Sequence, residues 1–220
     1  MDPRVVASPA QQLANAWRCA RSLTRRLGTA LGQCLGQFGS SNAKFERESS
    51  PFCHDGTERR IPRPQDADEQ KSCYSGKKKC HTVKNILLVN ARLTILFLSD
   101  TYEGSAHDKR IADTTPYPLP SGSELLQDLG FLAFALDGVN TITPFKKPRG
   151  GSLTEEQKAF NQQLARRRVR SEHVNSSVKR CRIVKDTMRL FRDSVRDMVA
   201  EICCALHNFR VRLSPWKPMV

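Results

Sequence analysis

The chain has 220 residues and a formal net charge of +14, from 36 Lys and Arg against 22 Asp and Glu. Its length suffices for one well-packed domain with extensions. No apolar run approaches the ~18 residues of a membrane span, and none near Met1 has the ~7–15 residues of a secretory signal. We therefore expect no membrane as partner, and a basic surface that favours a polyanion, nucleic acid before acidic protein.

Eight cysteines are scattered along the chain without the spacing of a disulfide framework. Free thiols in a reducing compartment are the expected state. The expected location is the cytoplasm or nucleoid of a bacterial host, or the nucleus of a eukaryotic one.

Residues 1–50 form a basic segment in which Asp2 is the only acid before Glu46. Apolar residues recur at helical spacing and favour one or two amphipathic helices. Three other interpretations stay open: an organelle transit peptide, part of a DNA-binding helical region, or unrelated upstream sequence joined by truncation. No DNA-binding motif is recognisable there. The apolar positions are Leu13, Trp17, Ala20, Leu23, Leu27, Leu31 and Leu35.

Residues 51–213 have the regular pattern of an α/β domain, with a short tail at 214–220. Short apolar runs alternate with turns before two long helical patterns, which predicts mixed strands with helices on the faces of the sheet. The expected elements are a polar loop at 65–75, a hairpin of strands 85–90 and 94–99, a short helix with a serine N-cap at 104–113, strands at 124–127 and 140–143, a long helix after Ser152, and a last helix at about 193–213.

The long helix is predicted to begin with a capping box, formed by Ser152 with Glu155 or by Thr154 with Gln157. A packed stripe is expected at Phe160, Leu164, Ser171, Val174, Val178 and Cys181. In the last helix, the stripe is Val195, Met198, Val199, Ile202, Leu206 and Phe209.

Glu172 is the single acid in the basic run RRRVRSEHVNSSVKRCR. At 100° per residue it lies roughly 120° from the axis of the packed stripe, on the side of Arg168 and Lys179. It therefore has two interpretations: an ion pair with one of these cations, or a metal ligand beside a bound polyanion.

Two upstream acids are candidate partners for Glu172, because each stands where a strand could end. Asp55 lies in HDGTE and Asp128 in ELLQDLGF. Mg²⁺ and Mn²⁺ prefer oxygen ligands, and a two-metal site can activate a nucleophile and stabilise the leaving oxygen of a phosphodiester. The alternatives are a turn residue for Asp55 and a loop cap for Asp128.

A set of motifs in fixed order strengthens the metal interpretation. HDGTERRIPRP, YSGKKKCHTVKNILLV, TYEGSAHDKRIAD, LLQDLGF, PFKKPRG, LTEEQKAFNQQLARRRVRSEHVNSSVKRCRIV and ALHNFRVRL follow one another over residues 55–213. Together they resemble the DDE-superfamily endonuclease domain of insertion-sequence and Harbinger-type transposases. The resemblance implies an RNase H-like core, two divalent ions (Mg²⁺ or Mn²⁺), and DNA cleavage and strand transfer.

Carried over to this sequence, the resemblance makes Asp55, Asp128 and Glu172 the catalytic and metal-binding triad. Asp108 in GSAHD is the reserve candidate for the second ligand. Asp128 is preferred, because an RNase H-like core has its second ligand after the fourth strand.

Basic clusters are expected to contact the phosphates of double-stranded DNA at transposon ends and target, with a homodimer as a further expectation. The alternative for each cluster is a solvated charged face. The residues are Lys77, Lys78, Lys79, Lys146, Lys147, Arg149, Arg166, Arg168, Lys179 and Arg180, with Arg166–Arg170 as one run.

Pro51 stands inside the stretch ESSPFCH that should form the strand leading to Asp55, and central strands tolerate proline poorly. The leading hypothesis is accordingly a transposase-like DNA endonuclease, complete or as a truncated or impaired copy. The alternative is a non-catalytic, basic DNA-binding remnant. A third hypothesis, from the N-terminal composition, is an organelle-targeted or RNA-binding protein.

Overall fold

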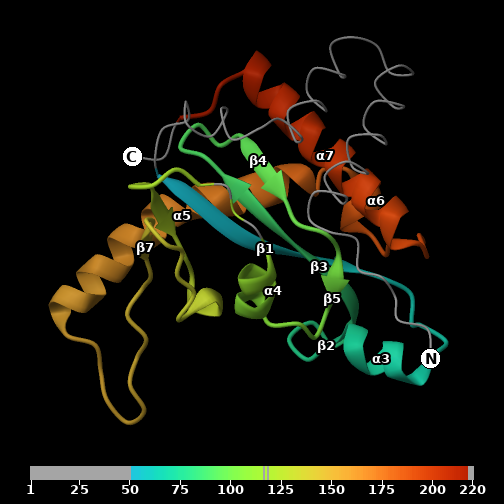
Figure 1. Ribbon diagram of the computed structural model, residues 1–220, viewed down its shortest axis with the longest axis horizontal. Helices are drawn as coiled ribbons and strands as arrows, with labels where there is room; N and C mark the ends of the chain where they lie inside the picture. The colour runs from blue at the N-terminus through green and yellow to red at the C-terminus, as the bar shows by residue number, and fades with distance from the viewer. Residues whose placement is uncertain (1–50, 116, 118, 218–220) are drawn as a thin grey trace.

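The computed structural model describes residues 51–115, 117 and 119–217, and Figure 1 shows their arrangement. The predicted N-terminal segment 1–50 lies outside the described residues. The strands are β1 (Phe52–Arg60), β2 (Tyr74–Ser75), β3 (Cys80–Val89), β4 (Ile95–Leu98), β5 (Tyr102–Glu103), β6 (Glu124–Leu126) and β7 (Asn140–Ile142). The helices are α3 (Ala67–Cys73), α4 (Asp108–Thr114), the 3-10 turn η2 (Leu129–Phe131), α5 (Glu155–Val178), α6 (Arg182–Lys185) and α7 (Asp193–Leu213).

β1 is the centre of a mixed sheet with the order β2-β3-β1-β6-β7, in which β4 and β5 also pair with β3. β3 runs antiparallel to β1, whereas β6 is parallel to β1 and β7 is parallel to β6. The register pairs Cys53 with Leu126 across the parallel junction. The α/β prediction, a mixed RNase H-like sheet flanked by helices, is confirmed.

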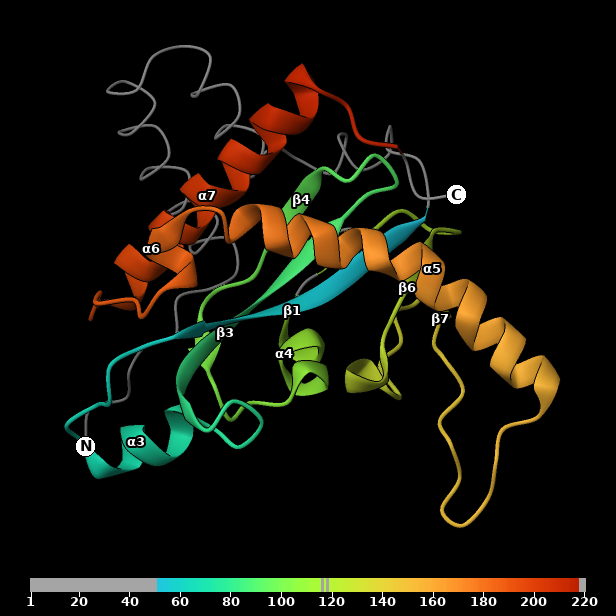
Figure 2. The same ribbon diagram turned by 180° about the vertical axis from the view of Figure 1, so that it is seen from behind.

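The two faces of the sheet carry separate cores, because successive side chains of a strand point to opposite faces. Cys53 packs with Leu126, Val174 and Cys204 under α5 and α7. Phe52, one residue earlier, packs in the second core, toward α4 and η2. Figure 2 shows α5 crossing the sheet on the first face.

The two long helices form where the sequence predicts them. α5 begins with the Thr154–Gln157 capping box, in which each side chain bonds the other residue's backbone. Phe160, expected in the packed stripe, is 38% exposed, because the first turns of α5 extend beyond the sheet (Figure 2). Cys181, the other end of that stripe, lies beyond the helix and is the N-cap of α6.

Three local predictions are wrong. The expected polar loop at 65–75 contains α3, since Asp66 caps the helix by accepting from the backbone N–H groups of Asp68 and Glu69. The short helix α4 begins after His107 rather than at a serine cap. Pro51 does not interrupt the first strand, because β1 begins one residue later.

None of the helices within the described ranges is both long and apolar enough to cross a membrane.

Candidate active site

Asp55 lies in the middle of β1, not at the end of a strand as the sequence indicated. Its side chain shares the face of Cys53 and accepts a hydrogen bond from Asn175 Nδ2 of α5 at 2.5 Å. Burial raises the pKa of Asp55 from its ordinary 3.8 to about 6, against the opposing charge of Arg168 and the Asn175 hydrogen bond. The nearby carboxylates of Asp128 and Glu172 raise it further.

Asp128 reaches the same region because β6 is the parallel neighbour of β1. Leu126 pairs with Cys53 across the two strands, and Asp128 and Asp55 each come two residues after this pair. Because side chains two residues apart in a strand lie on the same face of the sheet, both acids point to one face. Asp128 is the N-cap of η2 and accepts from the Gly130 backbone N–H at 2.7 Å. The loop cap and the acidic site are thus both features of this residue.

Glu172 faces these two strands from α5, one turn after Arg168 and one turn before Asn175. These two neighbours contact Asp128 and Asp55 respectively. Glu172 itself is exposed, and makes no ion pair within 4 Å with any described residue. The ion-pair interpretation is therefore not what the structure contains, since Arg168 pairs with Asp128 instead.

Asp108, the reserve candidate, approaches from the opposite face of β1. A Cβ placed on Gly56 would lie 3.4 Å from Asp108 Cγ, and Gly56 points away from the face of Asp55. Asp108 begins α4 and forms an ion pair with Lys84 at 3.2 Å. It also borders Gly130, whose added Cβ would lie 3.1 Å from Asp108 Oδ2.

Arg168 links the acids electrostatically. Its guanidinium is 3.7 Å from Asp128 Oδ2, its side chain is 13% exposed, and its charge opposes the burial-raised pKa of Asp55. Its Nε is buried without a hydrogen-bond partner. Sequence reasoning assigned Arg168 to DNA and missed Asn175 altogether; the one available signal was their spacing of one turn on either side of Glu172.

The three acids have the ligand chemistry that a divalent metal needs, but their side chains are not grouped closely enough to hold one. Carboxylate oxygens are the ligands that Mg²⁺ and Mn²⁺ select. Within the described part of the chain, however, no three His, Cys, Asp or Glu side chains are grouped so as to hold a metal ion. A cation, Arg168, already pairs with one of the acids.

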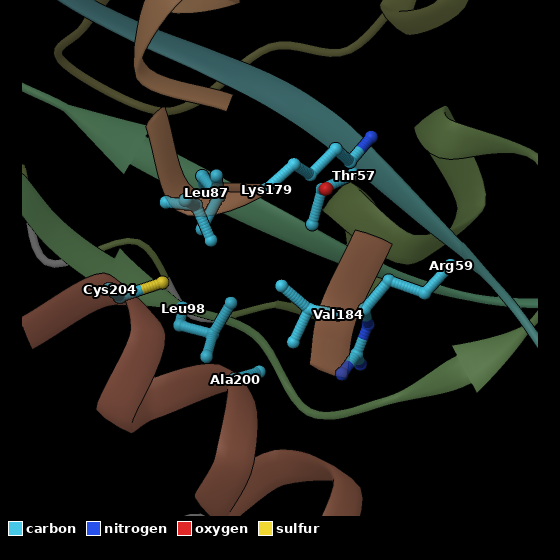
Figure 3. Close-up of a pocket in the computed structure, with 9 residues that line it drawn as sticks. Thr57, Arg59, Leu87, Leu98, Lys179, Val184, Ala200 and Cys204 are labelled. Atoms are coloured by element: carbon cyan, nitrogen blue, oxygen red, sulfur yellow. The ribbon is translucent and has the colours of Figure 1, made fainter. Parts of the chain in front are cut away.

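A small pocket lies between β1, the end of α5, α6 and α7 (Figure 3). Thr57, Arg59 and Lys179 supply its polar lining, next to Leu98 and Cys204. Burial lowers the pKa of Lys179, and the charge of Lys78 adds to this, while the carboxylate of Asp55 opposes it.

The other predicted phosphate contacts lie in three segments of the chain. Lys77–Lys79 are exposed in the turn between β2 and β3, and Lys146, Lys147 and Arg149 are exposed in the loop before α5. Figure 2 shows this loop extending from the sheet edge at β7. Arg166 and Arg180 are exposed on and just after α5.

Comparison with known proteins identifies the family of this chain. A family model described as "DDE superfamily endonuclease" matches residues 54–208. The "Probable transposase for insertion sequence element IS702" of Microchaete diplosiphon is 32% identical over 146 residues, which is 66% of this chain and 52% of the relative. The chain thus spans about half the length of this relative. No solved structure matches the chain.

Proposed function

Because the chain belongs to the DDE superfamily endonucleases, we propose that it is a transposase-like DNA endonuclease that cleaves phosphodiesters and transfers strands. One observation carries the proposal: Asp55 and Asp128 follow in-register residues of adjacent parallel strands and share a face, across which α5 brings Glu172. Glu172 is near enough for its charge to raise the pKa of Asp55, although more than a hundred positions separate the two residues in the chain.

In this proposal Asp55, Asp128 and Glu172 supply the oxygen ligands of two divalent ions, Mg²⁺ or Mn²⁺. When bound, such ions activate the attacking water or hydroxyl and stabilise the leaving oxygen. Asn175 orients Asp55 through its 2.5 Å hydrogen bond. The exposed basic residues of the β2–β3 turn and of the loop before α5 hold the phosphates of the DNA.

We assign this role to a domain of residues 51–213, with 1–50 as an N-terminal basic segment and 214–220 as a tail. The proposed partner is double-stranded DNA, bound by a homodimer. The protein would act where this DNA is, in the cytoplasm or nucleoid of a bacterium or in the nucleus of a eukaryote.

A non-catalytic DNA-binding remnant is the second candidate function. The observation that favours it is that the described residues contain no ready group of three metal ligands, while the net charge of +14 still supports DNA binding.

The two functions differ in a nicking assay on supercoiled plasmid with Mg²⁺ or Mn²⁺. Glu172→Ala should abolish nicking, and the matched control Glu156→Ala, another exposed α5 glutamate, should retain it. Both variants should melt like the parent protein, because both side chains are exposed. Nicking that survives Glu172→Ala refutes the mechanism, and salt-sensitive DNA binding without nicking under either metal establishes the remnant.

A further inference from the structure

Arg168 is a largely buried cation at the acidic face of β1 and β6. Its guanidinium is 3.7 Å from Asp128 Oδ2, and its charge also acts on Asp55 and on the buried His54 and Cys53. The side chain comes from the same turn-by-turn row of α5 that carries Glu172 and Asn175. Arg168 is thus placed to offset the negative charge of Asp55 and Asp128, whose side chains lie on the same face of the sheet.

Arginine carries a fixed positive charge in proteins, so it cannot make room for a second cation by losing that charge. A divalent ion bound by the same carboxylates would meet a fixed positive charge. The guanidinium and the metal ion therefore compete for the same carboxylates. The metal ion binds either after the guanidinium has moved away or with an affinity lowered by the repulsion between the two charges.

The contact that holds Arg168 is a weak one of its kind. Good charge-assisted N–H···O bonds span about 2.7–2.9 Å, and strong arginine–carboxylate pairs are bidentate. Among the described residues, Arg168 makes one ion pair, the 3.7 Å contact with Asp128 Oδ2; its side chain also hydrogen-bonds with the Cys53 thiol, and its Nε is buried without a partner. Arg167, the next residue, has a closer partner of its own in Glu124 at 3.2 Å.

We propose that Arg168 is a displaceable counter-ion, which holds the Asp55–Asp128 pair in the metal-free protein and is expelled from it when a divalent cation binds. The inference rests on the proposed function, since it takes this acidic face as the metal site. It adds one step to the role of the triad: the Arg168 guanidinium is exchanged for a divalent cation from solution.

The test measures Mn²⁺ binding to the full chain without DNA. The readout is the decrease of the free Mn²⁺ signal in electron paramagnetic resonance. Arg168→Gln should tighten Mn²⁺ binding by about tenfold or more, because the competing charge is gone. Arg168→Lys, which keeps the charge, should remain closer to the parent. The control Arg167→Gln removes the same charge one residue away and should change affinity by less than about threefold.

A second measurement separates displacement from misfolding. In the presence of EDTA, Arg168→Gln should melt below the parent, because the acids lose their counter-ion, and Mn²⁺ should then raise its melting temperature by more than it raises that of the parent. Asp128→Asn should weaken Mn²⁺ binding in both backgrounds.

The outcomes distinguish the two proposals. Mn²⁺ binding that depends on Asp128 but is unchanged or weakened by Arg168→Gln overturns the counter-ion and leaves the metal site standing. If Mn²⁺ binds to the Arg168→Gln variant but not to the parent protein, the result supports the counter-ion and shows that Arg168 blocks the metal site of the parent. Absence of Mn²⁺ binding in every variant overturns both.

Discussion

Replacing Glu201 by Gln should stabilise the protein at neutral and higher pH. Glu201 lies on α7, and burial raises its pKa from the ordinary 4.5 to about 7, with the carboxylates of Asp197 and Asp100 raising it further. Between these two values the folded protein binds a proton that the unfolded chain has released. Stability from this group is therefore complete below pH 4.5 and is lost as the pH rises toward 7.

The size of the effect follows from the shift. A difference of 7 against 4.5, at about 1.4 kcal/mol per pH unit, sets a ceiling of about 3 kcal/mol on the stability lost. Since Glu201 is half-buried, solvent screening reduces this to about 1–2 kcal/mol. Gln keeps the shape of the protonated acid, so the substitution should restore that amount above pH 7 and change little near pH 4.5.

Urea unfolding at pH 5 and pH 8 measures this directly, as the difference between variant and parent at each pH. Asp197 and Asp100 titrate in both proteins and largely cancel in that difference. The exposed Glu156→Gln serves as control and should show no pH-dependent gain. If Glu201→Gln loses stability at pH 8, the carboxylate is held in its charged form by a cation and the reasoning is refuted.

Two further predictions concern the core and the DNA surface. Leu126→Ala removes a fully buried side chain at the junction of β1 and β6 and should lower the free energy of unfolding by about 2–5 kcal/mol in urea, whereas Leu129→Ala, 45% exposed, should cost far less. Replacing Lys146, Lys147 and Arg149 together by Ala should reduce the slope of log affinity against log salt by about 2–3 for duplex DNA, measured by fluorescence anisotropy. An unchanged slope would show that this loop does not contact phosphate.

The last helix shows how a correct element can have an incorrectly predicted face. Its bounds, 193–213, agree with the sequence pattern, but the predicted apolar stripe is only half-buried. The buried face carries polar residues, because the sheet offers partners for them. His207 Nε2 bonds the Leu93 carbonyl at 2.8 Å, and Asn208 bonds both N–H and C=O of Ile95 at 2.8 Å. Hydropathy periodicity cannot register such partners, since they come from the β3–β4 turn and from β4, more than a hundred positions earlier in the chain.

The three acids of the proposed site could be selected from the sequence, but the contacts around them could not. Asp128 follows a short apolar run, and Glu172 is conspicuous among cations. That Arg168 pairs with Asp128 and Asn175 with Asp55 depends on how α5 is rotated over the strands, which no local pattern determines. The pairing also explains why Glu172 has no described ion pair despite its basic neighbours.

Whether Asp55 lies near Asp128 or near Asp108 depends on which face of the sheet each side chain of β1 points to, and His54 helps to determine this. His54 is fully buried toward α4, stacked on Phe131 at 3.7 Å between ring centroids, with Nδ1 3.3 Å from the Tyr117 hydroxyl. Burial lowers the pKa of His54 to about 3, so it fills this aromatic core as a neutral ring. A slip of one residue would move His54 under α5 and turn Asp55 toward α4, the side of Asp108. The aromatic contacts oppose that slip, and so they favour the face on which Asp55 meets Asp128.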